Sequence, residues 1–334
     1  MIVAPEPQGD GGQNSAYRLT AASSTLMANY LVTGGAGFIG SHISEALVTR
    51  GHRVRVADNF VTGYHRNIRD GVEFVEGDCS DPAFAKQIVA GMDYVIHQAA
   101  IPSVPRSVEK PLESHRANVD GMLHMLLASR DAGVKRLVFA GSSSVYGDTE
   151  VLPKTETMPT NPMTPYALQK LTGEQYGQMF TRLYGFETVT TRYFNVFGPR
   201  QDPGSPYSGV ISLFIKALSE GTRPVIYGDG EQTRDFTYVA NVVDGVIRAA
   251  ETPGVGGHVI NVATGSRISL NQLLGALKKI FNASVEPIYK DGRAGDVRDS
   301  QADIAKAAKL LGYKPTVAFE DGLRETVKWF REGQ

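Results

Sequence analysis

The chain has 334 residues, of which 42% are hydrophobic and 21% charged, and its net charge is −1. This length suits one large domain with a smaller one, and the composition is that of a globular protein. Because there is no basic excess and no apolar run of membrane-spanning length, we expect neither nucleic acid nor a membrane as a partner. The single cysteine, Cys79, excludes an internal disulfide and gives no zinc-ligand spacing, so we expect a structural thiol, no metal and a cytoplasmic protein.

The first 28 residues differ from the rest, because they are rich in proline, glycine, serine and threonine. They lack the basic start and apolar middle of a signal peptide. We interpret residues 1–28 as a flexible N-terminal extension, with Met27 as a candidate internal start.

From residue 29 onward, short apolar runs alternate with segments of helical periodicity. The pattern predicts strands at 30–32, 53–57, 72–75, 94–96, 136–140 and 188–192, and helices at 38–49, 107–132 and 165–184. Such alternation is typical of a parallel sheet with helices on both faces. The fold prediction is therefore α/β, with a Rossmann-type doubly wound parallel sheet over residues 29–195.

After residue 195 the alternation is less regular. The pattern predicts helices at 210–220, 239–251, 270–281, 304–311 and 319–330, and short strands at 225–227 and 258–262. We interpret residues 196–334 mainly as a smaller C-terminal α/β substrate-binding lobe, with some segments returning to the main sheet.

A tight glycine turn follows the first predicted strand. Its glycines stand three apart at Gly34, Gly37 and Gly40, and the next helix opens with Phe38 and Ile39. Glycine permits the turn and the close approach of a pyrophosphate, and the helix N-terminus offers free N–H groups to that charge. The segment therefore predicts a dinucleotide-binding site.

An acidic residue, Asp58, follows at the end of the second predicted strand, 18 residues after Gly40. A carboxylate there can accept hydrogen bonds from the adenosine ribose hydroxyls and repels a 2′-phosphate, which favours NAD over NADP. We include the neighbouring Asn59 in the same site. Without the glycines, Asp58 would be interpreted as a turn residue at a strand end.

A Tyr-x-x-x-Lys pair, Tyr166 and Lys170, lies on the third predicted helix. Residues at i and i+4 share one helix face, and Thr164 and Pro165 suit the cap and the first helical position. We expect the Lys170 ammonium to lower the pKa of the Tyr166 phenol from about 10, as general acid–base catalysis requires.

A run of three serines supplies the hydroxyl that would complete this group. Ser142, Ser143 and Ser144 directly follow the fifth predicted strand, at the sheet edge where open α/β sheets bind ligands. Either the pair or the serines alone would be weak signals, but their order and their place in the predicted topology indicate one catalytic site.

From residue 29 onward the sequence resembles the extended short-chain dehydrogenase/reductases that act on nucleotide sugars. The matching segments are Gly-x-x-Gly-x-x-Gly, Ser…Tyr-x-x-x-Lys, and residues 192–195, 228–230, 234–236 and 293–296. The resemblance implies that Tyr166 is the base, that Lys170 binds the nicotinamide ribose, and that Ser142 bonds the reacting hydroxyl. Ser143 is the close alternative, because the choice depends on a three-residue spacing to Val145.

The same resemblance implies further ligand contacts. Asp78 would touch the adenine, Ala99 and Ala100 would line the cofactor cleft, and Asn118 would help to hold the local backbone. The implied substrate-binding residues are Ser103, Ser142, Ser144, Asn195, Arg234, Arg293, Asp296 and Ser300. A guanidinium fork matches phosphate oxygens, although either arginine alone could be a surface ion pair.

Related reactions differ from this sequence at particular positions. Nucleotide-sugar 4,6-dehydratases carry Thr-Asp-Glu where this chain has residues 142–144, and UDP-glucuronate 4-epimerases typically have Thr at the position of Asn195. Residues 103–107 and 195–203 resemble the UDP-N-acetylglucosamine epimerase branch more than the UDP-glucuronate decarboxylases. We therefore predict a 4-epimerase with tightly held NAD, and keep another nucleotide-sugar enzyme and a silent NAD-binding scaffold as alternatives.

One position, Ser300, bears on the sugar. The resemblance places it at the wall of the pocket for the 2-substituent, where a large tyrosine restricts the enzyme to glucose and galactose. A small serine leaves room for an acetamido group, so we expect UDP-N-acetylglucosamine and UDP-N-acetylgalactosamine as substrates, with the plain UDP-hexoses also open. The alternatives are that Ser300 caps a helix or is merely exposed.

The resemblance also implies a homodimer through a four-helix bundle formed by the helices predicted at 107–132 and 165–184. The apolar residues proposed for that face are Met122, Met125, Leu126, Met179, Phe180 and Leu183. They could equally point into their own core.

Overall fold

The computed structural model of the protein describes residues 27–202, 209–292 and 297–332. Its centre is a seven-stranded, wholly parallel sheet in the order β11-β6-β5-β4-β1-β2-β3. The strands are β1 (Asn29–Thr33), β2 (Arg53–Asp58), β3 (Val72–Glu76), β4 (Tyr94–His97), β5 (Arg136–Ser142), β6 (Glu187–Tyr193) and β11 (Val259–Val262). The strand order reverses direction at β1, so the predicted Rossmann-type doubly wound sheet is confirmed.

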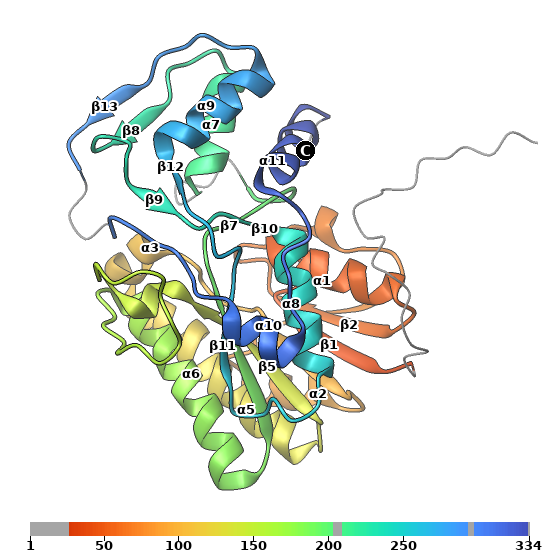
Figure 1. Ribbon diagram of the computed structural model, residues 1–334. Helices are drawn as coiled ribbons and strands as arrows, with labels where there is room; N and C mark the ends of the chain where they lie inside the picture. Colours follow the sequence, from red (N-terminus) through yellow and green to blue (C-terminus); the bar gives the residue numbers. More distant parts are fainter. Residues whose placement is uncertain (1–26, 203–208, 293–296, 333–334) are drawn as a thin grey trace, which may run out of the picture.

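Helices cover both faces of this sheet (Figure 1). One layer contains α1 (Phe38–Thr49) and α8 (Val239–Glu251), and the opposite layer contains α2 (Pro82–Val89), α5 (Gly121–Asp131) and α6 (Pro165–Tyr184). Two buried apolar clusters fill the spaces between sheet and helices, one on each side. Both faces of the central strands are therefore inside, which explains their continuous apolar sequences.

A smaller lobe lies above the carboxyl edge of the sheet in Figure 1. Its main elements are α7 (Val210–Ser219), β8 (Val225–Tyr227), β9 (Thr233–Arg234), β12 (Ile268–Ser269), α9 (Leu270–Phe281), β13 (Ile288–Lys290) and α11 (Phe319–Arg331). The short strands pair as β8 with β13 and β9 with β12, while β7 (Val196–Phe197) pairs with β10 (Thr237–Tyr238). The boundary between the two domains at residue 195 stays a prediction. After that residue, α8, β11 and α10 (Ala305–Leu311) pack on or join the central sheet.

The long helix predicted at 107–132 is confirmed over residues 111–131, but its predicted start is wrong. The structure instead has α3 (Val104–Glu109), α4 (Pro111–His115), a π-turn η3 (Arg116–Asp120) and then α5. Pro111 has no N–H to continue the α3 ladder, so the chain breaks at Lys110, whose ψ is +65°. Helix α2 is absent from the prediction, although its start carries a signal, because Asp81 caps it and Pro82 occupies its first position.

The residues proposed for the dimer face divide between core and surface. Met122, Met125, Leu126 and Phe180 are buried between their helices and the sheet, so this part of the prediction is wrong. Met179 and Leu183 on α6 are exposed, as expected for an outward face. None of the described helices is both long and apolar enough to span a membrane.

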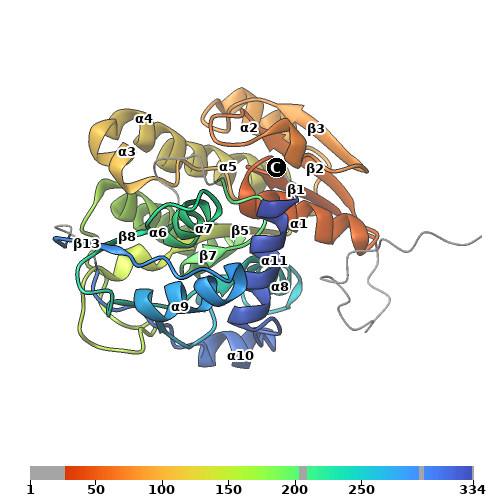
Figure 2. The ribbon, with the colours of Figure 1, turned by 90° about the horizontal axis from the view of Figure 1, so that it is seen from above.

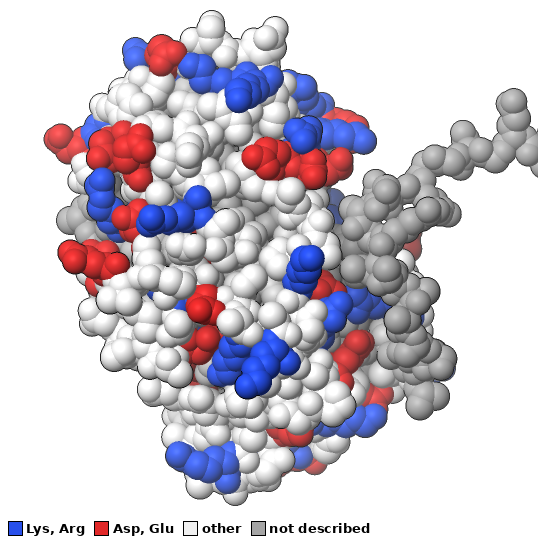
Figure 3. Space-filling model, viewed as in Figure 1, with Lys and Arg blue, Asp and Glu red and all other residues white. Residues whose placement is uncertain are grey.

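Charged side chains of both signs are interspersed over the face drawn in Figure 3. Lysines and arginines alternate with acids on both the sheet domain and the smaller lobe. This mixture agrees with the net charge of −1.

Candidate active site

The glycine turn brings the start of α1 to the carboxyl edge of the sheet. Gly34 has a φ of +67°, and a Cβ there would lie 2.7 Å from the backbone N of Ala99. A Cβ on Gly40 would lie 2.2 Å from the Gly34 carbonyl oxygen. The turn can close this tightly only because these positions are glycine.

The N-terminus of α1 is left open toward this edge. No side chain caps Gly37, and the first turn, which begins with Phe38 and Ile39, contains no acidic residue. The first N–H groups of the helix and its dipole therefore have no anionic side chain to satisfy them. The residues present fit the diphosphate of a dinucleotide, which would be held here by backbone N–H groups.

Asp58 fastens the glycine turn from the end of β2. Its carboxylate accepts hydrogen bonds from the backbone N of Ala36 at 3.0 Å and of Phe60 at 2.8 Å. Burial raises the pKa of this carboxyl, and the backbone hydrogen bonds oppose that change. Asp58 is thus positioned beside the turn, and its contact with a ribose stays a prediction.

The other residues proposed to bind the adenosine end lie on neighbouring strand ends. Asn59 is exposed and accepts a hydrogen bond from Val61 N, and Asp78, after β3, is exposed and accepts from Ser80 N. The Asn59 carboxamide and the Asp78 carboxylate are both exposed to solvent, at the sheet edge that carries the glycine turn. Their contacts with a cofactor stay predictions.

Asn118 anchors the segment that follows β4. Its side-chain oxygen accepts from Ile101 N at 2.8 Å, and its amide donates to Ile101 O at 3.3 Å and to Gln169 Oε1 at 2.8 Å. These bonds hold the backbone just beyond Ala99 and Ala100, which are half-buried. Asn118 therefore fixes the backbone at Ile101, and it also joins the π-turn to α6.

The proposed catalytic serine lies at the last position of β5. Ser142 Oγ is 2.8 Å from Ser144 Oγ and accepts a hydrogen bond from Ser144 N at 3.2 Å. The 3₁₀ turn η4 (Ser143–Tyr146) begins directly after it. The Ser142 hydroxyl lies near enough to the Tyr166 phenol to lower its pKa, against the effect of burial. Of the two serines considered from the sequence, Ser142 is therefore the one that lies beside Tyr166.

The start of α6 places Tyr166 as expected. Thr164 Oγ1 accepts from Ala167 N at 3.3 Å, Pro165 is the first helical residue, and Ser107 Oγ accepts from Tyr166 N at 3.1 Å. Ser103 similarly caps α3, because its Oγ accepts from Arg106 N at 3.1 Å. These capping bonds fix the helix ends that border the site.

Lys170 lies one turn below Tyr166 and is 4% exposed. Its Nζ donates to the Ala140 carbonyl at 2.9 Å and lies 5.9 Å from the centre of the Tyr166 ring. Burial lowers the pKa of Lys170 to about 8 and raises the pKa of Tyr166 to about 12, the Ser142 hydrogen bond acting against the latter rise. The expected lowering of the Tyr166 pKa by Lys170 is wrong, because burial of the phenol outweighs an ammonium that is directed at a carbonyl.

Two proposed substrate residues in the second half of the chain, Asn195 and Arg234, are among the described residues. Asn195 is exposed and has a φ of +24°, a strained value for a residue other than glycine. Arg234 Nη1 donates to the carbonyls of Thr233 and Arg298, at 2.8 and 2.9 Å. The remaining proposed residues Arg293 and Asp296 lie outside the described residues.

Ser300 is held against β9. It is 6% exposed, and its backbone N donates to Thr233 O at 3.1 Å. Helix α10 begins only at Ala305, and Asp303 Oδ1 accepts from Ala305 N at 2.7 Å. Ser300 is therefore neither exposed nor a helix cap, which removes both alternatives considered from the sequence.

Several buried polar residues around the site carry no sequence prediction. Asp235, fully buried, accepts hydrogen bonds from Thr264 N, Gly265 N and Ala302 N. It thereby ties β9 to the segment that carries Ser300. The sequence signal for Asp235 is its place in the Arg-Asp-Phe motif at 234–236. From that motif only Arg234 was predicted to bind substrate.

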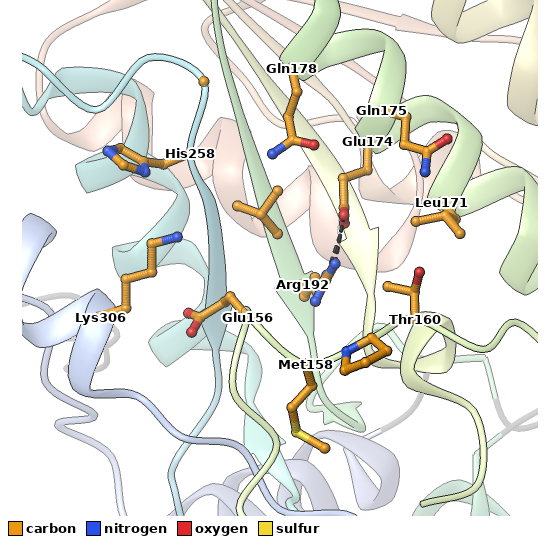
Figure 4. Close-up of a pocket in the computed structure, with 13 residues that line it drawn as sticks. Glu156, Met158, Thr160, Leu171, Glu174, Gln175, Gln178, Arg192, His258 and Lys306 are labelled. Atoms are coloured by element: carbon orange, nitrogen blue, oxygen red, sulfur yellow. Dashed lines mark hydrogen bonds and ion pairs between the residues drawn. The ribbon is translucent and has the colours of Figure 1, made fainter.

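A cavity of about 330 Å³ lies between α6, β6, β11 and α10 (Figure 4). The ion pair of Arg192 with Glu174, two bonds of 2.8 and 2.6 Å, crosses it. Its lining includes neither Ser142, Tyr166 nor Lys170. This cavity is therefore separate from the proposed catalytic group.

Cys79 is buried next to the sheet, where burial raises the pKa of its thiol to about 12. Such a thiol stays protonated, in agreement with a structural role. Across the described ranges, no group of His, Cys, Asp and Glu is arranged to hold a metal ion.

Comparison with known proteins gives one family. The model described as the NAD dependent epimerase/dehydratase family matches residues 30–263. A putative UDP-glucose 4-epimerase of Methanocaldococcus jannaschii is 40% identical over 303 residues, which cover 90% of this chain and 98% of that protein.

Two solved structures superimpose closely on this fold, each with a TM-score of 0.88. The UDP-N-acetylglucosamine 4-epimerase of Methanobrevibacter ruminantium M1, in complex with UDP-N-acetylmuramic acid, is 40% identical and covers 92% of this chain and 99% of its own. The UDP-glucose 4-epimerase of Thermotoga maritima, with UDP-glucose, is 39% identical and covers 91% of this chain and 99% of its own.

Proposed function

The chain belongs to the NAD dependent epimerase/dehydratase family, and from that premise we propose that it interconverts UDP-N-acetylglucosamine and UDP-N-acetylgalactosamine at C4. Its cofactor is NAD. The observation that carries the reaction is the placement of three groups at the carboxyl edge of the sheet: Ser142 ends β5, Tyr166 lies in the first turn of α6, and Lys170, buried one helical turn below, donates to Ala140 O of β5.

In the proposed reaction, NAD supplies reversible acceptance of the C4 hydrogen. Tyr166 takes the proton of the sugar 4-hydroxyl and returns it after the 4-keto sugar has turned over. Ser142, which lies beside the Tyr166 phenol, bonds the same sugar oxygen and keeps it within reach of the base. Because the hydrogen removed from C4 is returned to C4, the reaction would consume no cofactor over a full cycle, so the cofactor would stay bound.

Lys170 has two functions in this scheme. Its ammonium, held by Ala140 O, offsets only part of the cost that burial places on a Tyr166 phenolate. Its remaining N–H groups suit the hydroxyls of the nicotinamide ribose. Burial of the cation is costly, and the low pKa of Lys170 reflects that cost.

The proposed sugar preference depends on Ser300. A serine that is buried beside β9 presents a small side chain where a tyrosine would fill space, so an acetamido group on C2 can be accommodated. The named activity of the M. ruminantium relative supports this preference. The names of the M. jannaschii and T. maritima relatives favour the plain UDP-hexose pair as a second candidate.

Two further expectations remain proposals. We propose a homodimer, because exposed apolar side chains gather on α3, α4 and α6. We also propose a cytoplasmic location, based on the single buried thiol and the nature of the sugar-nucleotide substrate.

The test uses the purified protein without added NAD and follows both sugar pairs by NMR. We expect conversion of the acetylated pair at least as fast as that of the plain pair. Ser300→Tyr should lose the acetylated pair and keep the plain one, since a tyrosine fills the C2 space. Ser284→Tyr, at an exposed position, serves as the matched control. Equal conversion of both pairs by Ser300→Tyr would refute the role of Ser300, and no conversion of either pair by the wild type would refute the epimerase.

A further inference from the structure

Lys154 is a buried lysine that none of the roles above uses. It is 1% exposed, and its Nζ donates to the Gly147 carbonyl at 3.2 Å and lies 6.0 Å from the Tyr146 ring centre. Within the described ranges, no carboxylate lies at ion-pair distance from this ammonium. Burial lowers the pKa of Lys154 and outweighs Asp148 and Asp299, which favour its charged form from beyond ion-pair distance. A cation is therefore costly here, which indicates that its position serves a purpose.

The backbone of Lys154 is bonded to the segment that carries Ser300. Lys154 N donates to Gln301 O at 2.8 Å, and Lys154 O accepts from Asp303 N at 2.9 Å. Residues 301–303 continue directly from Ser300, which β9 holds from the other side. Any movement of Lys154 is therefore transmitted to the proposed wall of the sugar pocket.

The side chain of Lys154 is bonded to the turn that carries the catalytic serine. Gly147, its acceptor, ends η4, which starts directly after Ser142. A second route runs through Asn261, which accepts from Tyr146 Oη at 2.8 Å and donates to Lys154 O at 2.9 Å. Lys154 is thus connected to both ends of the proposed reaction centre.

We propose that Lys154 is a positioning residue that fixes the catalytic turn, residues 142–147, relative to the sugar-pocket wall at Ser300. The two segments come from different halves of the chain, and their separation sets both the reach of Ser142 and the room at C2. The inference rests on the proposed function for its substrates. Lys154 touches neither substrate nor cofactor in this account and acts through its two neighbours.

The main test is Lys154→Met, which keeps the backbone bonds and most of the side-chain volume but removes the ammonium. For UDP-N-acetylglucosamine we expect kcat to fall about tenfold with little change in KM, since sub-ångström misplacement of reacting groups lowers rates strongly. The kcat/KM ratio of acetylated to plain substrate should move toward one. Lys306→Met, a half-buried lysine on α10, is the control and should leave both values unchanged.

A second measurement does not depend on the substrate. Hydrogen exchange of Lys154→Met should be faster than wild type at residues 142–147 and 299–303, and unchanged at residues 34–40. Tyr146→Phe removes the hydrogen bond to Asn261 and leaves the Lys154–Gly147 bond in place. This variant should give a smaller increase in exchange at the same residues. It replaces Lys154→Met as the test if Lys154→Met does not fold.

The outcomes separate this inference from the proposed function. If the wild type converts neither sugar pair, the proposed function fails, while the exchange data still decide whether Lys154 couples the two segments. Unchanged exchange in both segments would overturn the inference. So would an equal loss of activity on both substrates with an unmoved ratio, which indicates a merely structural role.

Discussion

Tyr166 and Lys170 on α6 titrate away from their ordinary values in opposite directions. Burial raises the pKa of the phenol to about 12 and lowers the pKa of the ammonium to about 8. In both cases the neutral form is favoured, because a charge is costly where water is excluded. Proton transfer at neutral pH therefore depends on keeping Lys170 charged while Tyr166 becomes a phenolate.

This pair predicts the pH dependence of kcat. Below its pKa of about 12, the phenolate fraction of Tyr166 grows with pH, so log kcat should rise from pH 6. Above about pH 8 Lys170 loses its proton and no longer favours the phenolate, so the profile should bend there. Initial rates at saturating substrate between pH 6 and 9.5 measure this shape.

Lys170→Met isolates the cause of the bend. It should lower kcat at pH 7 by about a hundredfold, within the range typical of general acid–base contributions, and remove the bend. Lys309→Met, an exposed lysine on α10, should keep the wild-type profile. A bend near pH 8 that persists in Lys170→Met would show that another group titrates.

Single residues of the site were predictable where a motif names them. The glycines, Asp58, Ser142, Tyr166 and Lys170 lie together at the sheet edge, as their order in the sequence indicated. The burial of Lys154 and Asp235 was not predictable, because a charged side chain is usually solvated. Whether such a side chain is buried depends on segments that are distant in sequence. The predicted direction of the Tyr166 pKa shift was wrong for the same reason, because the burial that raises this pKa could not be predicted from the local sequence.

Among the elements, the packing of the glycine turn against α1 is the most easily disturbed by the addition of a single methyl group. Gly40→Ala would place a Cβ 2.2 Å from the Gly34 carbonyl oxygen, so the turn or helix must shift. We expect the purified variant to hold at least tenfold less NAD than the wild type, because the backbone N–H groups lose their alignment. Absorbance of cofactor released on denaturation measures this content.

A helical glycine elsewhere gives the control. Gly275 on α9 has no atom near a prospective Cβ, so Gly275→Ala should raise stability by about 0.5–1 kcal/mol and leave the NAD content unchanged. Wild-type NAD content in Gly40→Ala would contradict the close packing of this turn.

Helices with a regular apolar period were predicted to the residue, as α1, α6, α8 and α9 show, and α6 and α9 also carry side-chain caps. The segment at 104–131 was not, because a continuous period hid the break at Pro111 and the π-turn at 116–120. That π-turn is stabilised by bonds of Asn118 to Ile101 and Gln169. Such tertiary bonds override local periodicity and cannot be read from spacing alone.

At the scale of the whole molecule, α3, α4 and α6 lie next to one another (Figure 2), and exposed apolar side chains occur on all three helices. Leu112 is 86% exposed, Leu183 is 61% and Leu168 is 54%. Patches of this kind on soluble proteins usually mark interaction sites. The face supports the proposed homodimer: Leu183 belongs to the expected residues, whereas Leu112 and Leu168 were not among them.

Leu168→Glu tests this face. A carboxylate in an apolar dimer interface is costly, so the variant should elute and scatter light as a monomer at concentrations where the wild type is a dimer. Leu213→Glu on α7, another exposed leucine, should leave the dimer intact. An unchanged dimer in Leu168→Glu, or a monomeric wild type, would contradict the assignment.

The measurement closest to the central claim uses UDP-N-acetylglucosamine deuterated at C4 in ordinary water, with Tyr166→Phe and Tyr176→Phe of the same helix as variant and control. If the C4 hydrogen is removed and returned within one closed site, the UDP-N-acetylgalactosamine formed should retain the deuterium at C4. Tyr166→Phe should convert at least a hundredfold more slowly, and Tyr176→Phe at the wild-type rate. Loss of deuterium to solvent, or no change of configuration at C4, would contradict the account.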